Sequence, residues 1–175
     1  MALLRAVNVG GHTPVAMAEL RQMLDDMGMH NPRTLLQTGN LVFQSPSSSE
    51  SELEALLETE TERRLGLRTD FLVRSASEWS SVVAQNPYPK AAESDPSHLV
   101  VVFLKSEPDQ ESVRALDAAP GPERTSAWGR HLFATYPEGI GRSKLTISLI
   151  ERKLGTRGTA RNWNTVLKLA ALAKS

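Results

Sequence analysis

The sequence contains no cysteine, which excludes disulfide bonds, thiolate nucleophiles and metal sites with sulfur ligands. Its four histidines lie far apart and no two are spaced i,i+4, so no helix can present two imidazoles on one face. No apolar run approaches the roughly 18 residues of a membrane span, and residues 1–5 do not resemble the start of a signal peptide. We therefore expect a cytoplasmic protein with no metal, no cofactor and no membrane partner.

Aromatic residues make up only 5% of the chain, which argues against a stacking platform for single-stranded nucleic acid. Common catalytic patterns are missing as well: neither G-x-S-x-G nor H-E-x-x-H occurs, and no acidic pair stands in an apolar surround. The hydrophobic content of 40% and the charged content of 23% are ordinary for a globular protein of 175 residues. The motifs leave open whether the protein is an enzyme.

The charges are unevenly distributed along the chain, although they sum to zero. From Gly139 onward there are eight Lys/Arg residues and one acid, Glu151, whereas the preceding part has twelve bases and nineteen acids. A neutral total therefore conceals a positive C-terminal segment and a negative body.

The first half of the chain has the element order β-α-β-β-α-β. Apolar or β-prone runs predict strands at 2–9, 33–37, 41–44 and 69–73. Apolar residues at helical spacing predict helices at 17–27, 50–65 and 75–85. On the helix at 50–65, we interpret the non-leucine positions as a solvated face that carries Glu52, Glu54, Glu58, Glu60 and Glu62.

The second half repeats this order in part. Strands are expected at 98–104, 123–128 and 130–136, and helices at 109–118, 143–154 and 159–173. The last helix stands where a repeat of the first half would place a strand. We predict an α+β fold of tandem ferredoxin-like (β-α-β-β-α type) halves with mainly antiparallel sheets and an additional C-terminal helix. The expected domains are 1–85 and 98–175, joined by a proline-rich linker at 86–97.

Two glycine-rich, basic segments are expected to begin helices, at Ser143 and at Thr159 as N-caps. Free amides and the helix dipole attract anions there, and Arg161 in a first turn would call for a negative partner. The P-loop spacing is absent. The candidate phosphate- or anion-binding residues are Arg142, Ser143, Lys144, Arg157, Thr159, Arg161, Asn162 and Lys168. The alternative is that these cations pair with the glutamate-rich first half.

A second group of residues is a candidate for lining a ligand cavity. A buried strand that bears Arg5 and Asn8 must satisfy their polar groups, either by anchoring loops or by facing a cavity. The candidate lining residues are Arg5, Asn8, Gly10, Gly11, Gln37, Asn40, Trp163 and Asn164. The alternative is that Asn8 and Asn40 only form turns.

Four ordered motifs resemble the bacterial domain-of-unknown-function family 1697: LRAVNVGG at 4–11, MAELR at 17–21, QTGNLVF at 37–43 and TARNWNTV at 159–166. The resemblance implies a two-part α+β fold of ferredoxin-like halves, and it brings no established substrate, cofactor or catalytic residue. Ala6 stands where the family pattern has glycine, and Thr38 where serine is common. The motif positions are Arg5, Asn8, Gly10, Gly11, Gln37, Gly39, Asn40, Thr159, Arg161, Asn162, Trp163 and Asn164.

The sequence does not determine the function, and three hypotheses remain open. The first is a binding protein whose basic C-terminal surface engages a phosphate-bearing partner, either a nucleotide or a nucleic acid. The second is a metal-independent enzyme that acts on a small polar metabolite in a cleft between the halves. The third is a protein-interaction module. The oligomeric state does not follow from the sequence.

Overall fold

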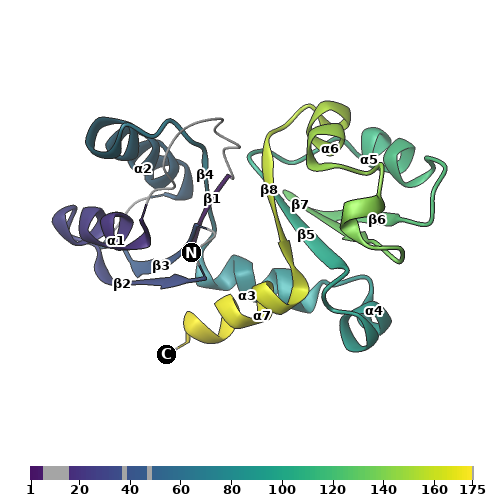
Figure 1. The fold of residues 1–175 in the computed structure, drawn as a ribbon, viewed down its shortest axis with the longest axis horizontal. Coiled ribbons are helices and arrows are strands. Elements are labelled where there is room, and N and C mark those ends of the chain that lie inside the picture. The colour runs from purple at the N-terminus through teal and green to yellow at the C-terminus, as the bar shows by residue number, and fades with distance from the viewer. Residues whose placement is uncertain (6–15, 37–38, 47–48, 175) are drawn as a thin grey trace. The chain divides into compact units, whose positions relative to one another are not determined.

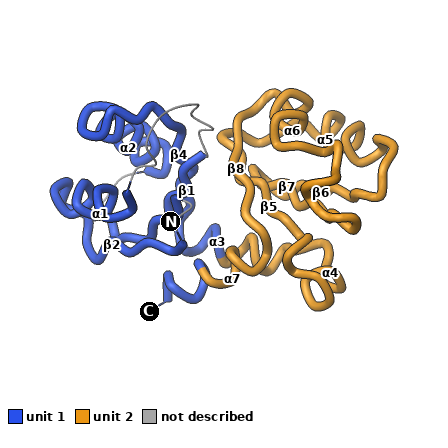
Figure 2. The backbone as a smooth tube through the Cα atoms, in the orientation of Figure 1, with its two compact units in different colours: residues 1–79, 169–175 blue, residues 80–168 orange. Residues whose placement is uncertain are grey.

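The structure is a computed structural model, and it describes residues 1–5, 16–36, 39–46 and 49–174. The chain forms two compact units (Figure 2). Unit 1 comprises residues 1–79 and those from 169 onward, and unit 2 comprises residues 80–168. The chain therefore passes between the units twice. How it divides into independently folding domains stays a prediction.

Unit 1 is a ferredoxin-like βαββαβ unit (Figure 1). Its elements are β1 (Ala2–Leu4), α1 (Met17–Asp26), β2 (His30–Leu35), β3 (Asn40–Gln44), α2 (Glu50–Leu65) and β4 (Phe71–Val73). The four strands are antiparallel and lie in the order β2-β3-β1-β4. Both helices pack on one sheet face, where Leu20 and Met23 of α1 and Leu57 of α2 join Phe71 and Leu4 in one core.

Unit 2 repeats the same topology element by element. Its elements are β5 (Leu99–Leu104), α5 (Gln110–Asp117), β6 (Arg124–Trp128), β7 (His131–Thr135), α6 (Ile147–Leu154) and β8 (Gly158–Asn162). The strand order is β6-β7-β5-β8, again antiparallel. Three further helices, α3 (Ala76–Ala84), α4 (Pro89–Ser94) and α7 (Trp163–Leu172), and the 3-10 helix η1 (Ile140–Arg142) complete the described elements. The tandem ferredoxin-like α+β fold predicted from the sequence is confirmed.

The prediction of one helix over 159–173 is wrong. Residues 158–162 form strand β8, which pairs with β5 along its whole length. Gly158 permits this close approach, because a Cβ there would lie 2.7 Å from the Phe103 carbonyl oxygen. Helix α7 begins only at Trp163, where the Asn162 side chain caps it by accepting from the Thr165 amide. The internal duplication is therefore complete, because β8 supplies the final strand that the sequence pattern did not predict.

The prediction of a helix over 143–154 is wrong at its start. Residues 140–142 form η1, and α6 begins at Ile147 after Thr146, whose hydroxyl accepts from the Leu149 amide. Ser143 therefore does not cap α6. The stretch 86–97 is also more regular than a linker, because α4 lies within it and begins with Pro89 at a position that needs no amide hydrogen.

The central strands are buried on both faces. In β5, Val100, Val102 and Leu104 belong to the core beneath α5 and α6, while Val101 and Phe103 point to the opposite face and have no exposed surface. Full burial of such side chains stabilises a fold by about 1.5–3 kcal/mol each. This explains why 99–104 is a continuously apolar run of the sequence.

Candidate cationic surface

The predicted anion-binding residues lie in three different environments. The first is the loop before α6, where the Ser143 hydroxyl donates to the Glu123 carboxylate and accepts from the Leu145 amide at 2.9 Å. Tyr136 donates from its hydroxyl to the Leu145 carbonyl at 3.0 Å. Burial, reinforced by the charge of Glu123, raises the pKa of Tyr136 to about 12. Ser143 thus sits beside a carboxylate, which disfavours an anion at that point.

The second environment is strand β8. Arg161 is only 9% exposed, and its Nη1 donates to the Thr159 hydroxyl and to the Ala160 carbonyl, both at 2.8 Å. Burial lowers the pKa of the Arg161 guanidinium to about 10. Both side chains leave the sheet on the face opposite α5 and α6, because they pair with Val101 and Phe103. The expected placement of Thr159 as an N-cap, with Arg161 in the first helical turn, is therefore wrong.

The third environment is the solvent-facing surface of unit 2. Arg142, Lys144, Arg152 and Lys153 are exposed on η1, on the following loop and on the last turn of α6. We call these four side chains the cationic surface. No carboxylate of a described residue forms a salt bridge with any of them, and the same is true of exposed Lys168 on α7. Arg157 is exposed directly before β8, at the far end of α6 from Arg142.

The single acid of the C-terminal segment does not neutralise this surface. The Glu151 carboxylate, on α6, accepts a hydrogen bond from the Gly158 backbone N–H at 2.9 Å. It is half-buried, whereas the neighbouring Arg152 and Lys153 face solvent. The charge asymmetry read from the sequence is therefore present on the surface of unit 2.

The second candidate group is divided between described and undescribed residues. Asn8, Gly10, Gly11 and Gln37 lie outside the residues that the structure describes. Arg5 lies 3.6 Å from the Asp70 carboxylate, and the Thr69 hydroxyl donates to the Arg5 carbonyl. Asn40 is fully buried at the start of β3 and donates from Nδ2 to the carbonyl of Leu35, the last residue of β2. These contacts join Arg5 and Asn40 to neighbouring segments of unit 1, and a role of either residue in lining a ligand cavity stays a prediction.

The other two members of that group lie on α7. Trp163 is buried, with 4% of its surface exposed, and Asn164 beside it faces solvent. Adjacent positions on a helix point about 100° apart, so the two side chains diverge. Asn164 instead shares its exposed face with Lys168, one turn further along.

A cavity of about 810 Å³ lies in unit 1, away from every residue that the sequence nominated. Its lining includes Met1, residues 42–45 at the end of β3 and residues 73–76 at the end of β4. Its polar lining comes from Arg33, Glu50, Arg74 and Lys174, with apolar walls from Val42 and Leu53.

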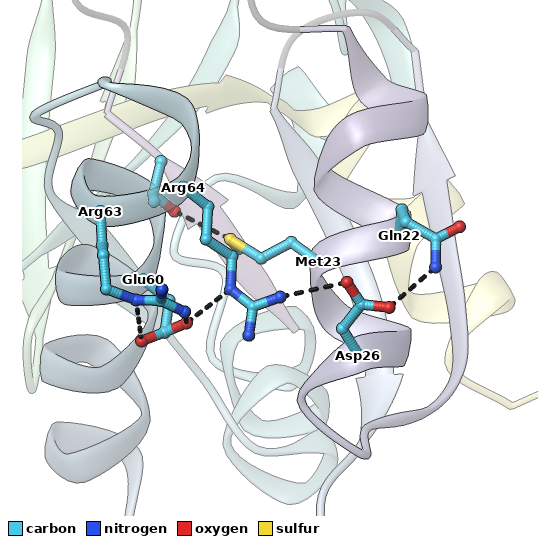
Figure 3. A network of polar contacts seen from close by, with 7 residues as sticks. Gln22, Met23, Asp26, Glu60, Arg63 and Arg64 are labelled. Atoms are coloured by element: carbon cyan, nitrogen blue, oxygen red, sulfur yellow. Dashed lines mark hydrogen bonds and ion pairs between the residues drawn. The ribbon is translucent and has the colours of Figure 1, made fainter.

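The interpretation of the α2 glutamates as a solvated face is wrong in part. Glu54 is only 6% exposed, and its carboxylate accepts from the Val73 backbone amide. The exposed part of the helix carries the ion pairs drawn in Figure 3, where Glu60 bonds Arg63 and Arg64, and Arg64 reaches Asp26 of α1. The hydrogen bonds from Arg63 and Arg64 lower the pKa of Glu60 to about 2. The spacing of Glu50, Glu54 and Glu58 by four residues was the signal in the sequence for a shared inward role.

Fold and side-chain arrangement together define a tandem ferredoxin-like α+β protein. The chain belongs to the DUF1697 family of proteins of unknown function, whose pattern it matches over residues 1–133. It is also similar in structure to a conserved bacterial protein, SP0830 from Streptococcus pneumoniae, with a TM-score of 0.77 and 23% sequence identity. That similarity covers 98% of this chain and 96% of the other, and it supports the fold alone. Comparison with curated proteins gives no significant match.

Two further observations concern the described residues only. Their histidine, aspartate and glutamate side chains form no cluster of three that would suit a metal ion. None of their helices combines the length and the apolar character that crossing a bilayer requires.

Proposed function

We propose that unit 2 binds the phosphate backbone of a nucleic acid through the cationic surface on and beside α6. The observation that carries this proposal is the pairing state of the charges: Arg142, Lys144, Arg152 and Lys153 are exposed with no carboxylate of a described residue against them, and Glu151 is turned toward the Gly158 amide. Exposed cations without a neighbouring carboxylate raise the local concentration of a polyanion and speed its association.

The spread of these cations favours an extended partner over a single phosphate group. Helix α6 has eight residues, which corresponds to a length of about 12 Å, and the cations lie before its start and in its last turn. A site for one phosphate needs donors that converge, yet Ser143 is bonded to Glu123, and Thr159 and Arg161 belong to a strand. A backbone with repeated phosphates can contact cations that are spread out in this way.

The test is binding of a labelled duplex oligonucleotide over a series of salt concentrations, with the double variant Arg152→Ser/Lys153→Ser. We expect the variant to bind more weakly, and the slope of log K against log salt to become shallower by about 2, since each lost phosphate contact removes about 0.9.

The matched control is Arg63→Ser/Arg68→Ser in unit 1, which removes the same formal charge from residues that pair with Glu60 and Glu62. An equal loss of binding in both variants would attribute the effect to net charge and overturn the proposal. Tight binding of a mononucleotide, with no gain from a longer strand, would overturn the assignment of an extended partner.

A further inference from the structure

We propose that Glu50, Glu54 and Glu58 of α2 close the outer edge of strand β4, and that without them this edge pairs with β4 of a second copy of the chain. We call these three residues the carboxylate ladder. The device lies in unit 1 and is independent of the function proposed for unit 2.

In an edge strand, alternate residues direct their backbone amides toward the neighbouring strand and away from the sheet. On the inner side, Arg5 N–H bonds the Asp70 carbonyl and Arg74 N–H bonds the Met1 carbonyl, so the even-numbered residues of this segment face β1. The odd-numbered amides therefore point away from the sheet. Each of them donates to one glutamate: Phe71 to Glu58 at 2.9 Å, Val73 to Glu54 at 2.7 Å and Ser75 to Glu50 at 2.6 Å.

The repeat of the helix matches the repeat of the strand. Four residues of an α-helix rise about 6 Å, and two residues of a strand rise about 6.7 Å. Glutamates spaced by four can therefore meet alternate amides of a strand that runs in the opposite direction. Leu53 and Leu57 stand one position before Glu54 and Glu58, and they fill the core while the carboxylates reach the strand edge.

A buried cation supports the middle of the ladder. Arg74 has no exposed surface, and its guanidinium lies 3.7 Å from the Glu54 carboxylate and 3.4 Å from the Glu78 carboxylate. The cation and the Val73 amide thus both lie against the Glu54 carboxylate, and hydrogen bonds that involve an ionised group are stronger than neutral ones. The ladder is thus held by charge as well as by geometry.

An edge of this composition needs such protection. Residues 71–73 are Phe, Leu and Val, which favour β-structure and are all buried in the unit. An open apolar edge strand is a template for another strand. Antiparallel pairing of two β4 edges about a twofold axis would give each outward amide a carbonyl in place of a carboxylate. The three carboxylates prevent this pairing because they occupy the outward amides.

Unit 2 provides an internal comparison. At the equivalent edge, Gly158 N–H bonds Glu151, but no carboxylate of a described residue accepts from Ala160 N–H, the next outward amide. Strand β8 carries glycine and arginine in place of a run of large apolar residues. The full ladder therefore occurs where the edge strand has the greater tendency to self-pair.

The decisive experiment compares Glu50→Ala/Glu58→Ala with Glu50→Gln/Glu58→Gln, both of which keep the Glu54–Arg74 pair. The two variants lose the same charge, but glutamine retains an oxygen that can accept from the amide. Sedimentation over a range of protein concentrations is expected to show a dimer for the alanine variant and a monomer for the glutamine variant and the wild type. Exchange of the Phe71 and Ser75 amides in the monomer should accelerate at least about tenfold in the alanine variant.

A monomeric, folded alanine variant with unchanged amide exchange would overturn the proposal, as would equal dimerisation of both variants. If the double alanine variant does not fold, the single substitution Glu58→Ala decides. It should accelerate exchange at Phe71 and leave the Ser75 amide, which Glu50 protects, unchanged. Loss of protection at both amides alike would show general loosening of the unit and reject the ladder.

Discussion

The two units share one topology but have opposite net charges. Unit 1 carries eight Lys/Arg and eleven Asp/Glu residues, a difference of −3, and unit 2 carries twelve and nine, a difference of +3. In unit 1 many charges are used internally: three glutamates bond backbone amides of the β4 segment, and Arg63, Arg64, Arg68 and Arg74 meet carboxylates. In unit 2 the exposed cations of the α6 region meet none among the described residues. Duplication has preserved the strand order while the two copies use charge differently.

The largest effect is expected at the buried cation of unit 1. Replacing Arg74 by Leu leaves the buried Glu54 carboxylate without its cation, which should cost about 3–5 kcal/mol in the free energy of unfolding. Urea unfolding measures this loss. The double variant Arg74→Leu/Glu54→Leu should recover part of it, because the uncompensated charge is then gone. A loss below about 1 kcal/mol for the single variant would show that unit 1 does not depend on its internal charges.

The next largest effect is expected in unit 2, where it depends on how closely the backbones of β8 and β5 approach each other and not on charge. Gly158→Ala places a methyl group 2.7 Å from the Phe103 carbonyl oxygen and 2.9 Å from Leu104, so β8 must move away from β5. We expect a loss of about 1–3 kcal/mol in thermal or urea unfolding. An unchanged stability would contradict the close pairing that makes the second sheet complete.

A matched pair of substitutions tests whether the two units are equivalent. Gly66 ends α2 and Gly155 ends α6, both in the left-handed region with φ of 63° and 65° and with open space around the missing Cβ. Alanine at either position should cost about 1–2 kcal/mol from backbone strain alone. Equal losses, measured by urea unfolding, would support equivalent helix ends. A clear difference between the two losses would show that the helix ends at Gly66 and Gly155 are not equivalent.

The smallest effect is the acid dependence of the surface pairs on α2. Hydrogen bonds from Arg63 and Arg64 hold the pKa of Glu60 at about 2, below its ordinary value of 4.5. A carboxylate with a lowered pKa stabilises the folded state above its unfolded pKa, and this contribution is lost as the pH falls from about 4.5 to about 2. In the variant Arg63→Leu/Arg64→Leu, the free energy of unfolding should depend less on pH in that window. Between about pH 5 and 7 it should be nearly independent of pH in both proteins, as far as this pair is concerned. If the free energy of unfolding of wild type and variant falls equally as the pH is lowered, these ion pairs do not contribute to the acid dependence of unit 1.

Most of the fold could be predicted because the local patterns agree with the tertiary structure. The alternation of apolar residues, the hairpin around Gly129 and the helical spacing of Leu20, Met23 and Leu24 each specify one element without knowledge of the rest. The exception is 158–162, whose threonine, alanine and arginine residues directly precede a helical pattern and were therefore assigned to the helix. Only pairing with β5, which is distant in sequence, makes this segment a strand.

The candidate site was predicted less well, because side-chain chemistry depends on neighbours that the sequence does not place together. Ser143 was expected to face an anion, but its hydroxyl bonds Glu123, which lies twenty residues earlier. Arg161 was expected in a helix and is a buried strand residue. The excess of positive charge after residue 139 depends only on composition, and it is the part of the prediction that the surface of unit 2 retains.

The double crossing between the units has a consequence for synthesis on the ribosome. Unit 1 begins the chain but also includes residues from 169 onward. Among these, Leu169 is fully buried and Ala173 lines the cavity. Domains that are continuous in sequence can fold as soon as they emerge, at about 5–20 residues per second of elongation. Here the N-terminal unit must wait for its closing segment until the whole of unit 2 has been translated. The unit made first is therefore the one finished last.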